Sequence, residues 1–130
     1  MALTPFGKVK KQKEFVPLEG DEQKLVVQYL EQNGFKFTSI PNATYTTSWA
    51  SKQKNTNEGL RGGLPDLLLY LPKRGDKEPS LLFLEMKRVR GGVVSAKQRD
   101  WIEVLNTVQN VEAIVARGAR EAISLIKSYL

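Results

Sequence analysis

The chain has 130 residues, of which 41% are apolar and 26% charged, with a formal net charge of +6 and no histidine or cysteine. This length and composition predict a single globular domain with a hydrophobic core, and the lack of cysteine excludes disulfides, thiolate metal sites and cysteine nucleophiles. No apolar segment is long enough to span a membrane and the N-terminus has no apolar signal region, so we expect a cytoplasmic protein without a membrane partner.

Positive charge is concentrated in two segments that contain no acidic residue, at positions 1–13 and 86–99. Such clusters are typical of surfaces that bind polyanions, although one cluster alone is equally consistent with a solvated basic surface. Because two clusters occur, we predict a nucleic-acid partner. The predicted phosphate contacts are Lys8, Lys10, Lys11, Arg88 and Arg90.

Residues 1–18 are basic, contain two prolines and show no hydrophobic period, which predicts an N-terminal arm. A helix is then expected from about Asp21, which can cap it, to Asn33. Glu22 falls on the apolar stripe of this helix, an unusual position for a carboxylate, and a functional role is one explanation. The helix dipole alone also favours a glutamate in a first turn, so a purely structural role for Glu22 is an open alternative.

A strand is predicted at residues 35–40, where apolar and polar residues alternate. The following residues, 41–63, are polar and lack periodicity, and a segment of this length without a regular pattern predicts a functional loop. Its two aromatic residues, Tyr45 and Trp49, can either stack on nucleic-acid bases or cover an edge of the core.

Two apolar runs, residues 67–71 and 81–87, predict strands that are buried on both faces. A basic loop with two glycines then leads to a helix that Ser95 and Gln98 open with a capping box. The last elements are a strand at residues 111–116 and an amphipathic helix that runs to the C-terminus.

This order of elements predicts the fold class. Three strands joined by loops favour an antiparallel meander, and a helix between the last two strands implies a right-handed parallel crossover. We therefore predict an α/β fold in which a small mixed β-sheet is flanked by helices.

A split acidic pattern borders the two buried strands, with Asp66 before the first strand and Glu85 and Lys87 within the second. Strand alternation puts Glu85 and Lys87 on one face, while Met86 points away. Two carboxylates and the backbone carbonyl of Met86 would form an oxygen-only site, which suits Mg²⁺ or Mn²⁺ better than Zn²⁺. A proline–aspartate turn together with a surface salt bridge would have the same sequence pattern, but the apolar run around Glu85 favours a buried site.

Three segments resemble the VRR-NUC family, the virus-type replication-repair branch of the PD-(D/E)xK nuclease superfamily. They are residues 62–69 (GGLPDLLL), 84–87 (LEMK) and 95–101 (SAKQRDW). The resemblance covers about residues 19–130, which are the expected nuclease domain. It implies the restriction-endonuclease-like core of that superfamily, with the element order αβββαβα.

The resemblance also implies hydrolysis of DNA with Mg²⁺ or Mn²⁺ as cofactor. The implied catalytic residues are Glu22, Asp66, Glu85, Lys87 and Gln98, and the implied metal ligands are Asp66, Glu85 and the carbonyl of Met86. Glu22 would be the helix carboxylate that reaches the metal site. Glu19 is the alternative to Glu22, because spacing near the first helix is loose in this family.

Stand-alone members of the family, as in phages, resemble structure-specific nucleases that act as homodimers on four-way (Holliday) junctions. The resemblance therefore implies a phage or bacterial endonuclease that is a homodimer with branched DNA as its substrate. A flap or nicking nuclease on the same scaffold is one alternative. A DNA-binding module without catalytic activity is another.

Overall fold

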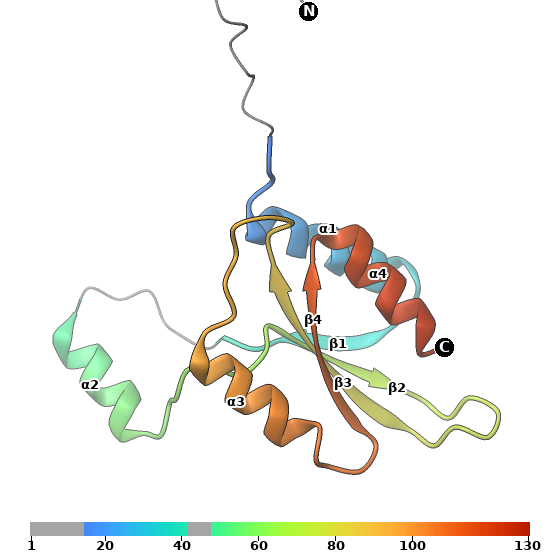
Figure 1. Ribbon diagram of the computed structural model, residues 1–130. Helices are drawn as coiled ribbons and strands as arrows, with labels where there is room; N and C mark the ends of the chain where they lie inside the picture. The colour runs from blue at the N-terminus through green and yellow to red at the C-terminus, as the bar shows by residue number, and fades with distance from the viewer. Residues whose placement is uncertain (1–14, 42–47) are drawn as a thin grey trace, which may run out of the picture.

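The computed structural model describes residues 15–41 and 48–130 (Figure 1), so most of the predicted N-terminal arm lies outside the described residues. The elements are α1 (Glu19–Gln32), β1 (Lys36–Ser39), α2 (Trp49–Asn57), β2 (Leu67–Leu71), β3 (Ser80–Lys87), α3 (Ala96–Leu105), β4 (Val111–Arg117) and α4 (Ala119–Ser128). This order matches the predicted one, with α2 as an addition. None of these described helices is long and apolar enough to cross a membrane.

The four strands form one mixed sheet in the order β1-β2-β3-β4. β1 and β2 pair antiparallel, as do β2 and β3, whereas β3 and β4 are parallel. The parallel pair is connected through α3, as a crossover requires. The predicted α/β fold, a small mixed sheet flanked by helices, is thus confirmed.

The hydrophobic core lies between one face of the sheet and the helices α1 and α4, while α3 packs near β4 (Figure 1). Side chains alternate along β3, so Leu82, Leu84 and Met86 point into this core. Glu85 and Lys87 point to the opposite face and are nevertheless buried. The alternation of one strand therefore delivers a carboxylate and an ammonium to a protected position outside the apolar core.

α1 begins two residues before its predicted start, at Glu19. Asp21 therefore lies in the first turn and does not cap the helix, and the residue at the cap position, Leu18, makes no side-chain hydrogen bond. At the other end, Gly34 has a φ of +69°, a conformation that commonly terminates helices. The earlier start matters for the site because it brings Glu19 into the helix.

α3 begins with the predicted capping box. Ser95 Oγ accepts a hydrogen bond from the N–H of Gln98, and the side chain of Gln98 accepts one from the N–H of Ser95. The helix ends at Leu105, so Val108 lies beyond it and is 50% exposed. α4 likewise ends at Ser128, short of the C-terminus.

α2 lies within the segment that was expected to be a loop without regular structure. Ser48 caps it by accepting a hydrogen bond from the N–H of Ser51, but none of its residues is buried. Trp49 is 75% exposed, so it does not cover an edge of the core. The second aromatic residue of this segment, Tyr45, lies outside the described residues.

Candidate active site

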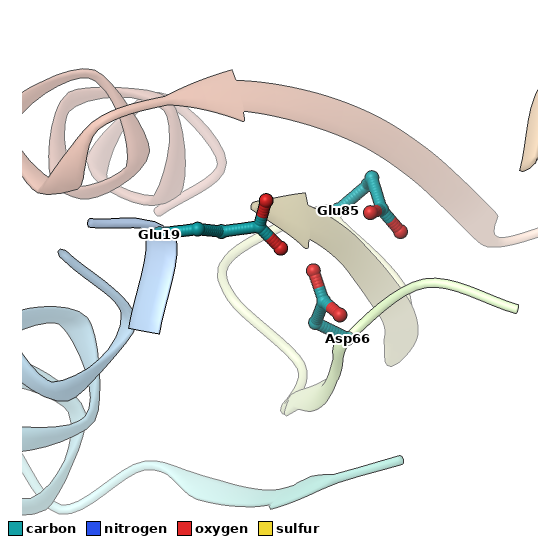
Figure 2. Close-up of side chains that lie close together, drawn as sticks. All are labelled: Glu19, Asp66 and Glu85. Atoms are coloured by element: carbon teal, nitrogen blue, oxygen red, sulfur yellow. The ribbon is translucent and has the colours of Figure 1, made fainter. Parts of the chain in front are cut away.

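Three carboxylates from different parts of the chain meet in this structure. Glu19 extends from the first turn of α1, Asp66 immediately precedes β2, and Glu85 lies in β3 (Figure 2). One carboxylate oxygen of each residue lies within 4.8 Å of one oxygen of each of the other two. Carboxylate oxygens at such separations can bind the same divalent cation.

Asp66 is fixed by backbone groups of both neighbouring strands. Its Oδ2 accepts a hydrogen bond of 2.8 Å from the N–H of Met86, and its carbonyl oxygen accepts one of 2.8 Å from the N–H of Ile40. Pro65 is fully buried and restricts the backbone just before the carboxylate. The pairing of β2 with β3 thus holds Asp66 beside Glu85.

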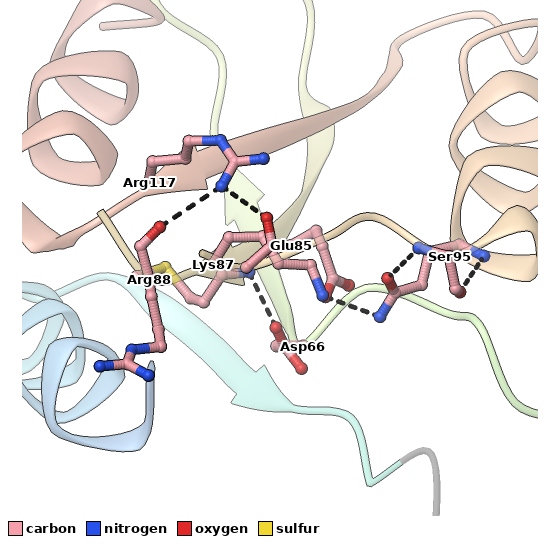
Figure 3. A network of polar contacts seen from close by, with 9 residues as sticks. Asp66, Glu85, Lys87, Arg88, Ser95 and Arg117 are labelled. Atoms are coloured by element: carbon pink, nitrogen blue, oxygen red, sulfur yellow. Dashed lines mark hydrogen bonds and ion pairs between the residues drawn. The ribbon is translucent and has the colours of Figure 1, made fainter. Parts of the chain in front are cut away.

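Glu85 is 1% exposed and is held by two polar side chains (Figure 3). Its Oε1 accepts a hydrogen bond of 3.0 Å from Nε2 of Gln98 and lies 3.4 Å from Nζ of Lys87. Gln98 is oriented in turn, because its own Oε1 accepts a hydrogen bond of 2.9 Å from the N–H of Ser95. The capping box of α3 therefore positions the amide that contacts the candidate ligand.

Burial raises the pKa values of the three carboxyl groups, and the negative charge of Asp66 adds to the increase for Glu19 and Glu85. Burial, followed by the negative charge of Asp66, raises the pKa of Glu85 from 4.5 to about 7, although the ammonium of Lys87 opposes the increase. Burial is also the largest cause of the raised pKa of Asp66, which the hydrogen bond from Met86 opposes. The pKa of Glu19 is raised by burial as well. A bound cation would favour the ionised form of all three.

The donor set fits a hard divalent ion. Oε2 of Glu85 is buried and accepts no hydrogen bond from the described residues. Two ionised carboxylates cannot hydrogen-bond to each other, so Glu85 and Asp66 can do so only when one of them is protonated. The chain has no histidine or cysteine, so every side-chain ligand it can offer here is an oxygen. Oxygen donors around an unsatisfied buried carboxylate are the environment that Mg²⁺ and Mn²⁺ prefer.

Glu22, the predicted helix carboxylate, lies at a different place from the other acids. It is buried, and its carboxylate accepts a hydrogen bond from the N–H of Ala119 at the start of α4. The structure therefore brings Glu19, the alternative to Glu22, together with Asp66 and Glu85. Glu22 was expected to reach the metal site. Its carboxylate is instead bound to the backbone at the start of α4.

The basic residues that follow β3 have two different placements. Arg88 is half-buried, and its guanidinium donates hydrogen bonds to the carbonyl oxygens of Pro17 at 3.3 Å and Val16 at 3.0 Å, just before α1. Arg90 is exposed in the loop that leads to α3. Arg88 thus secures the entry to α1. Three further predicted phosphate contacts lie outside the described residues, namely Lys8, Lys10 and Lys11.

Arg117, at the end of β4, supports the site although the sequence did not indicate it. Its Nη1 donates hydrogen bonds to the carbonyl oxygens of Gly92 at 2.8 Å and Arg88 at 3.5 Å (Figure 3). The N–H of the next residue, Gly118, donates to the carbonyl oxygen of Lys87 at 3.0 Å. These bonds tie the basic loop to the strand ends. The sequence carries no signal for them, because the acceptors are backbone carbonyls of a distant segment.

Comparisons of the sequence and of the structure with known proteins both point to one family. The VRR-NUC domain matches residues 18–120 of the chain. A solved structure of a VRR_NUC domain protein is similar to this one, with a TM-score of 0.67 and 22% sequence identity over 88% of each chain. At this identity the structural likeness shows a shared fold. No curated protein sequence matches the chain.

Proposed function

Because the chain belongs to the VRR-NUC family of PD-(D/E)xK-type nucleases, we propose that it is an endonuclease that hydrolyses DNA with Mg²⁺ or Mn²⁺ as cofactor. The observation that carries this proposal is the convergence of Glu19, Asp66 and Glu85, with the ammonium of Lys87 beside Glu85. Three neighbouring acids whose pKa values are all raised by burial are unfavourable for folding and are typical of functional sites. Metal binding gives them a physical reason to be together.

Each residue has a distinct role in this proposal. Asp66 and Glu85 are the main ligands, Glu19 is the third carboxylate, and the carbonyl of Met86 completes the predicted set. A bound divalent ion supplies Lewis-acid chemistry, because it offsets charge on the scissile phosphate and lowers the pKa of water. Lys87 either orients the attacking water or stabilises negative charge that develops on the phosphate. Its Nζ is held 3.4 Å from Glu85 for this purpose.

Gln98 takes part through Glu85 and is therefore a positioning residue. Its Nε2 donates a hydrogen bond of 3.0 Å to Oε1 of Glu85, while Oε2 of Glu85 accepts no hydrogen bond from the described residues. The amide thus selects which carboxylate oxygen is available to a cation. Partners that orient metal ligands in this way commonly affect metal affinity nearly as much as ligands do.

The finer proposal for the substrate is a four-way junction that a homodimer cuts. One chain has a single carboxylate cluster among its described residues, whereas resolving a junction needs cuts on two strands related by a two-fold axis. We propose the outer face of the sheet as the pairing surface, because Tyr70 and Leu81 are 41% and 36% exposed there. The exposed positions of α4 are polar, including Arg120, Ser124 and Lys127, and are less suited to pairing.

Cleavage of a synthetic junction, a flap and a nicked duplex, each with Mg²⁺, Mn²⁺ or a chelator, tests the activity. We expect the junction to be cut fastest, with symmetric incisions, and only when a divalent ion is present. Asp66→Asn and Glu85→Gln should abolish cleavage but retain DNA binding, and Glu103→Gln, at an exposed position of α3, is the matched control. Wild-type turnover by either site variant would disprove the site, and faster flap cleavage would favour the flap alternative.

Two further measurements test the homodimer. Sedimentation at micromolar concentration reports assembly, and Tyr70→Glu should weaken it, because a charge would be buried at the proposed pairing face. A supercoiled plasmid with a cruciform reports coupling of the cuts. Paired cuts give linear product directly, whereas independent nicks give open circles first. A monomer that only nicks would refute the junction proposal and favour a nicking nuclease.

The proposed phosphate contacts are Lys8, Lys10, Lys11, Arg88 and Arg90. Each contact that is lost should lower the slope of log affinity against log salt by roughly one. Arg90→Ala leaves intact the hydrogen bonds by which Arg88 holds the entry to α1. Lys24→Ala removes an exposed lysine of α1 and is the control, and an unchanged slope for Arg90→Ala would remove that residue from the interface.

A further inference from the structure

α2 is a helix that takes no part in the hydrophobic core. Its nine residues include none that is buried, and Figure 1 shows it standing apart from the sheet, on the side where α3 begins. A helix this short is marginal in water on its own. It is held by local contacts instead: Gln53 Nε2 donates to Asn57 Oδ1 at 3.2 Å, and Arg61 Nη1 donates to the carbonyl of Thr56 at 2.9 Å. The sequence therefore maintains a helix that contributes nothing to the core.

The surface of α2 is suited to a nucleic-acid strand. Trp49 is 75% exposed, and Lys52, three residues later, lies on the same side of the helix and makes no ion pair among the described residues. An exposed aromatic ring beside a lysine is the combination that stacks on unpaired bases and contacts the adjoining phosphates. The remaining α2 side chains are small or polar, so the helix has no apolar stripe with which to pack on another protein.

The chain connects α2 directly to the candidate active site. It leaves the helix through Gly59 and reaches Asp66 by way of Gly63, whose φ values are +103° and +108°. Gly63 packs so closely on α3 that an added Cβ would lie 2.8 Å from the carbonyl oxygen of Lys97 and 2.9 Å from Cδ1 of Trp101. This contact anchors one end of the α2 segment three residues before Asp66. Whatever α2 binds is consequently linked, through this anchor, to the segment that carries Asp66.

We propose that α2 is a DNA-contacting arm in which Trp49 stacks on an unstacked base at a branch point and Lys52 contacts a phosphate beside it. The inference rests on the proposed function and gives it a substrate class, DNA with unstacked bases next to the cut. Perfect duplex offers no exposed base face to the indole, so the arm discriminates between branched and unbranched DNA.

Binding without cleavage separates this inference from the activity. In a chelator, Trp49→Ala is expected to weaken binding to a junction or a splayed duplex by about five- to hundredfold, and binding to perfect duplex much less. Trp49→Phe should retain most of the affinity, because the ring is kept. Lys52→Ala should lower the salt slope by about one, whereas Lys24→Ala, at an exposed position of α1, should leave it unchanged.

Tryptophan fluorescence gives a direct reading of stacking. The chain has two tryptophans, so Trp101→Phe leaves Trp49 as the sole indole. Its emission should be quenched by branched DNA and not by duplex. Unchanged emission, or wild-type affinity of Trp49→Ala in a protein that still cuts DNA, would overturn the inference while the proposed function stands. Loss of a dimer in sedimentation of Trp49→Ala would also overturn it, by assigning α2 to a contact between copies. A wild-type protein that neither binds nor cuts DNA would overturn both.

Discussion

The raised pKa of Glu85 predicts that the metal-free protein becomes less stable as the pH increases, and that Glu85→Gln removes this dependence. A pKa that is higher in the folded state than in the unfolded state means that the folded protein binds the proton more tightly. The stabilisation is complete below the ordinary value of 4.5 and is lost as the pH rises through about 7. Above that pH, a buried carboxylate is ionised beside Asp66 with no cation to offset it.

The size of the effect follows from the same values. An increase from 4.5 to about 7 corresponds to on the order of 3 kcal/mol, since each tenfold change in an equilibrium constant is worth about 1.4 kcal/mol. Glu85 is 1% exposed, so solvent does little to screen the charge. A small domain has a free energy of unfolding of about 5–15 kcal/mol, so the loss is easily measured. Mn²⁺ at about 100 times its dissociation constant should raise the free energy of unfolding of the wild type by about 2.7 kcal/mol.

Urea unfolding in a chelator, between about pH 5 and about pH 8, measures this loss. The difference in stability between the wild type and Glu85→Gln is the informative quantity, because titrating groups distant from Glu85 cancel. We expect this difference to change by roughly 3 kcal/mol in favour of the variant as the pH rises. Glu103→Gln should follow the wild type, and Mn²⁺ at the higher pH should stabilise the wild type and Glu103→Gln more than Glu85→Gln. Parallel profiles for the wild type and Glu85→Gln would refute the reasoning.

Four further substitutions test the rest of the site and its surroundings. Glu19→Gln should weaken Mn²⁺ binding about tenfold or more in calorimetric titration, because the site loses a ligand charge; Glu22→Ala should instead lower the free energy of unfolding by about 1–3 kcal/mol, because the N–H of Ala119 would lose its acceptor. Gln98→Ala should weaken Mn²⁺ binding about 10- to 100-fold in the same titration. Gly63→Ala should lower the melting temperature in scanning calorimetry, because the residue has a φ of +108° and an added Cβ would lie 2.8 Å from a backbone oxygen of α3.

The strands and the polar residues next to them could be predicted because their signals are local. β2 occupies the predicted residues 67–71, and β3 begins one residue before its predicted start at position 81. Strand alternation then separates Glu85 and Lys87 from the apolar core, and the capping box identifies the start of α3. Gln98 has both roles, because its side chain caps α3 through Oε1 and contacts Glu85 through Nε2.

α2 could not be predicted from periodicity, because it has no apolar stripe and buries no residue. The signals that hold it are a capping serine and a polar side-chain contact four residues apart, and serine and asparagine are equally frequent in turns. A polar segment is recognised as a helix by its pattern only when one of its faces meets a core. α2 meets none, so the sequence pattern gave no reason to separate it from a loop.

The two glutamates of α1 illustrate what spacing alone leaves open. Glu22 does lie in line with the buried residue Val26, as predicted, but its partner is the N–H of Ala119, which is far along the chain. Glu19 lies one turn earlier and reaches the carboxylate cluster. The choice between them depends on how α1 sits against α4, which is tertiary information.

The same contact explains how the third carboxylate can be held in place at all. Glu19 lies in the first turn of α1, where the residue at the cap position makes no side-chain hydrogen bond. Glu22 binds the start of α4, and the N–H of Gly118 just before it donates to the carbonyl of Lys87 at 3.0 Å. Arg88, directly after Lys87, holds the chain that enters α1. The end of β3 is therefore linked to both sides of Glu19, so the strand that carries Glu85 and Lys87 also fixes the helix that brings the third acid to them.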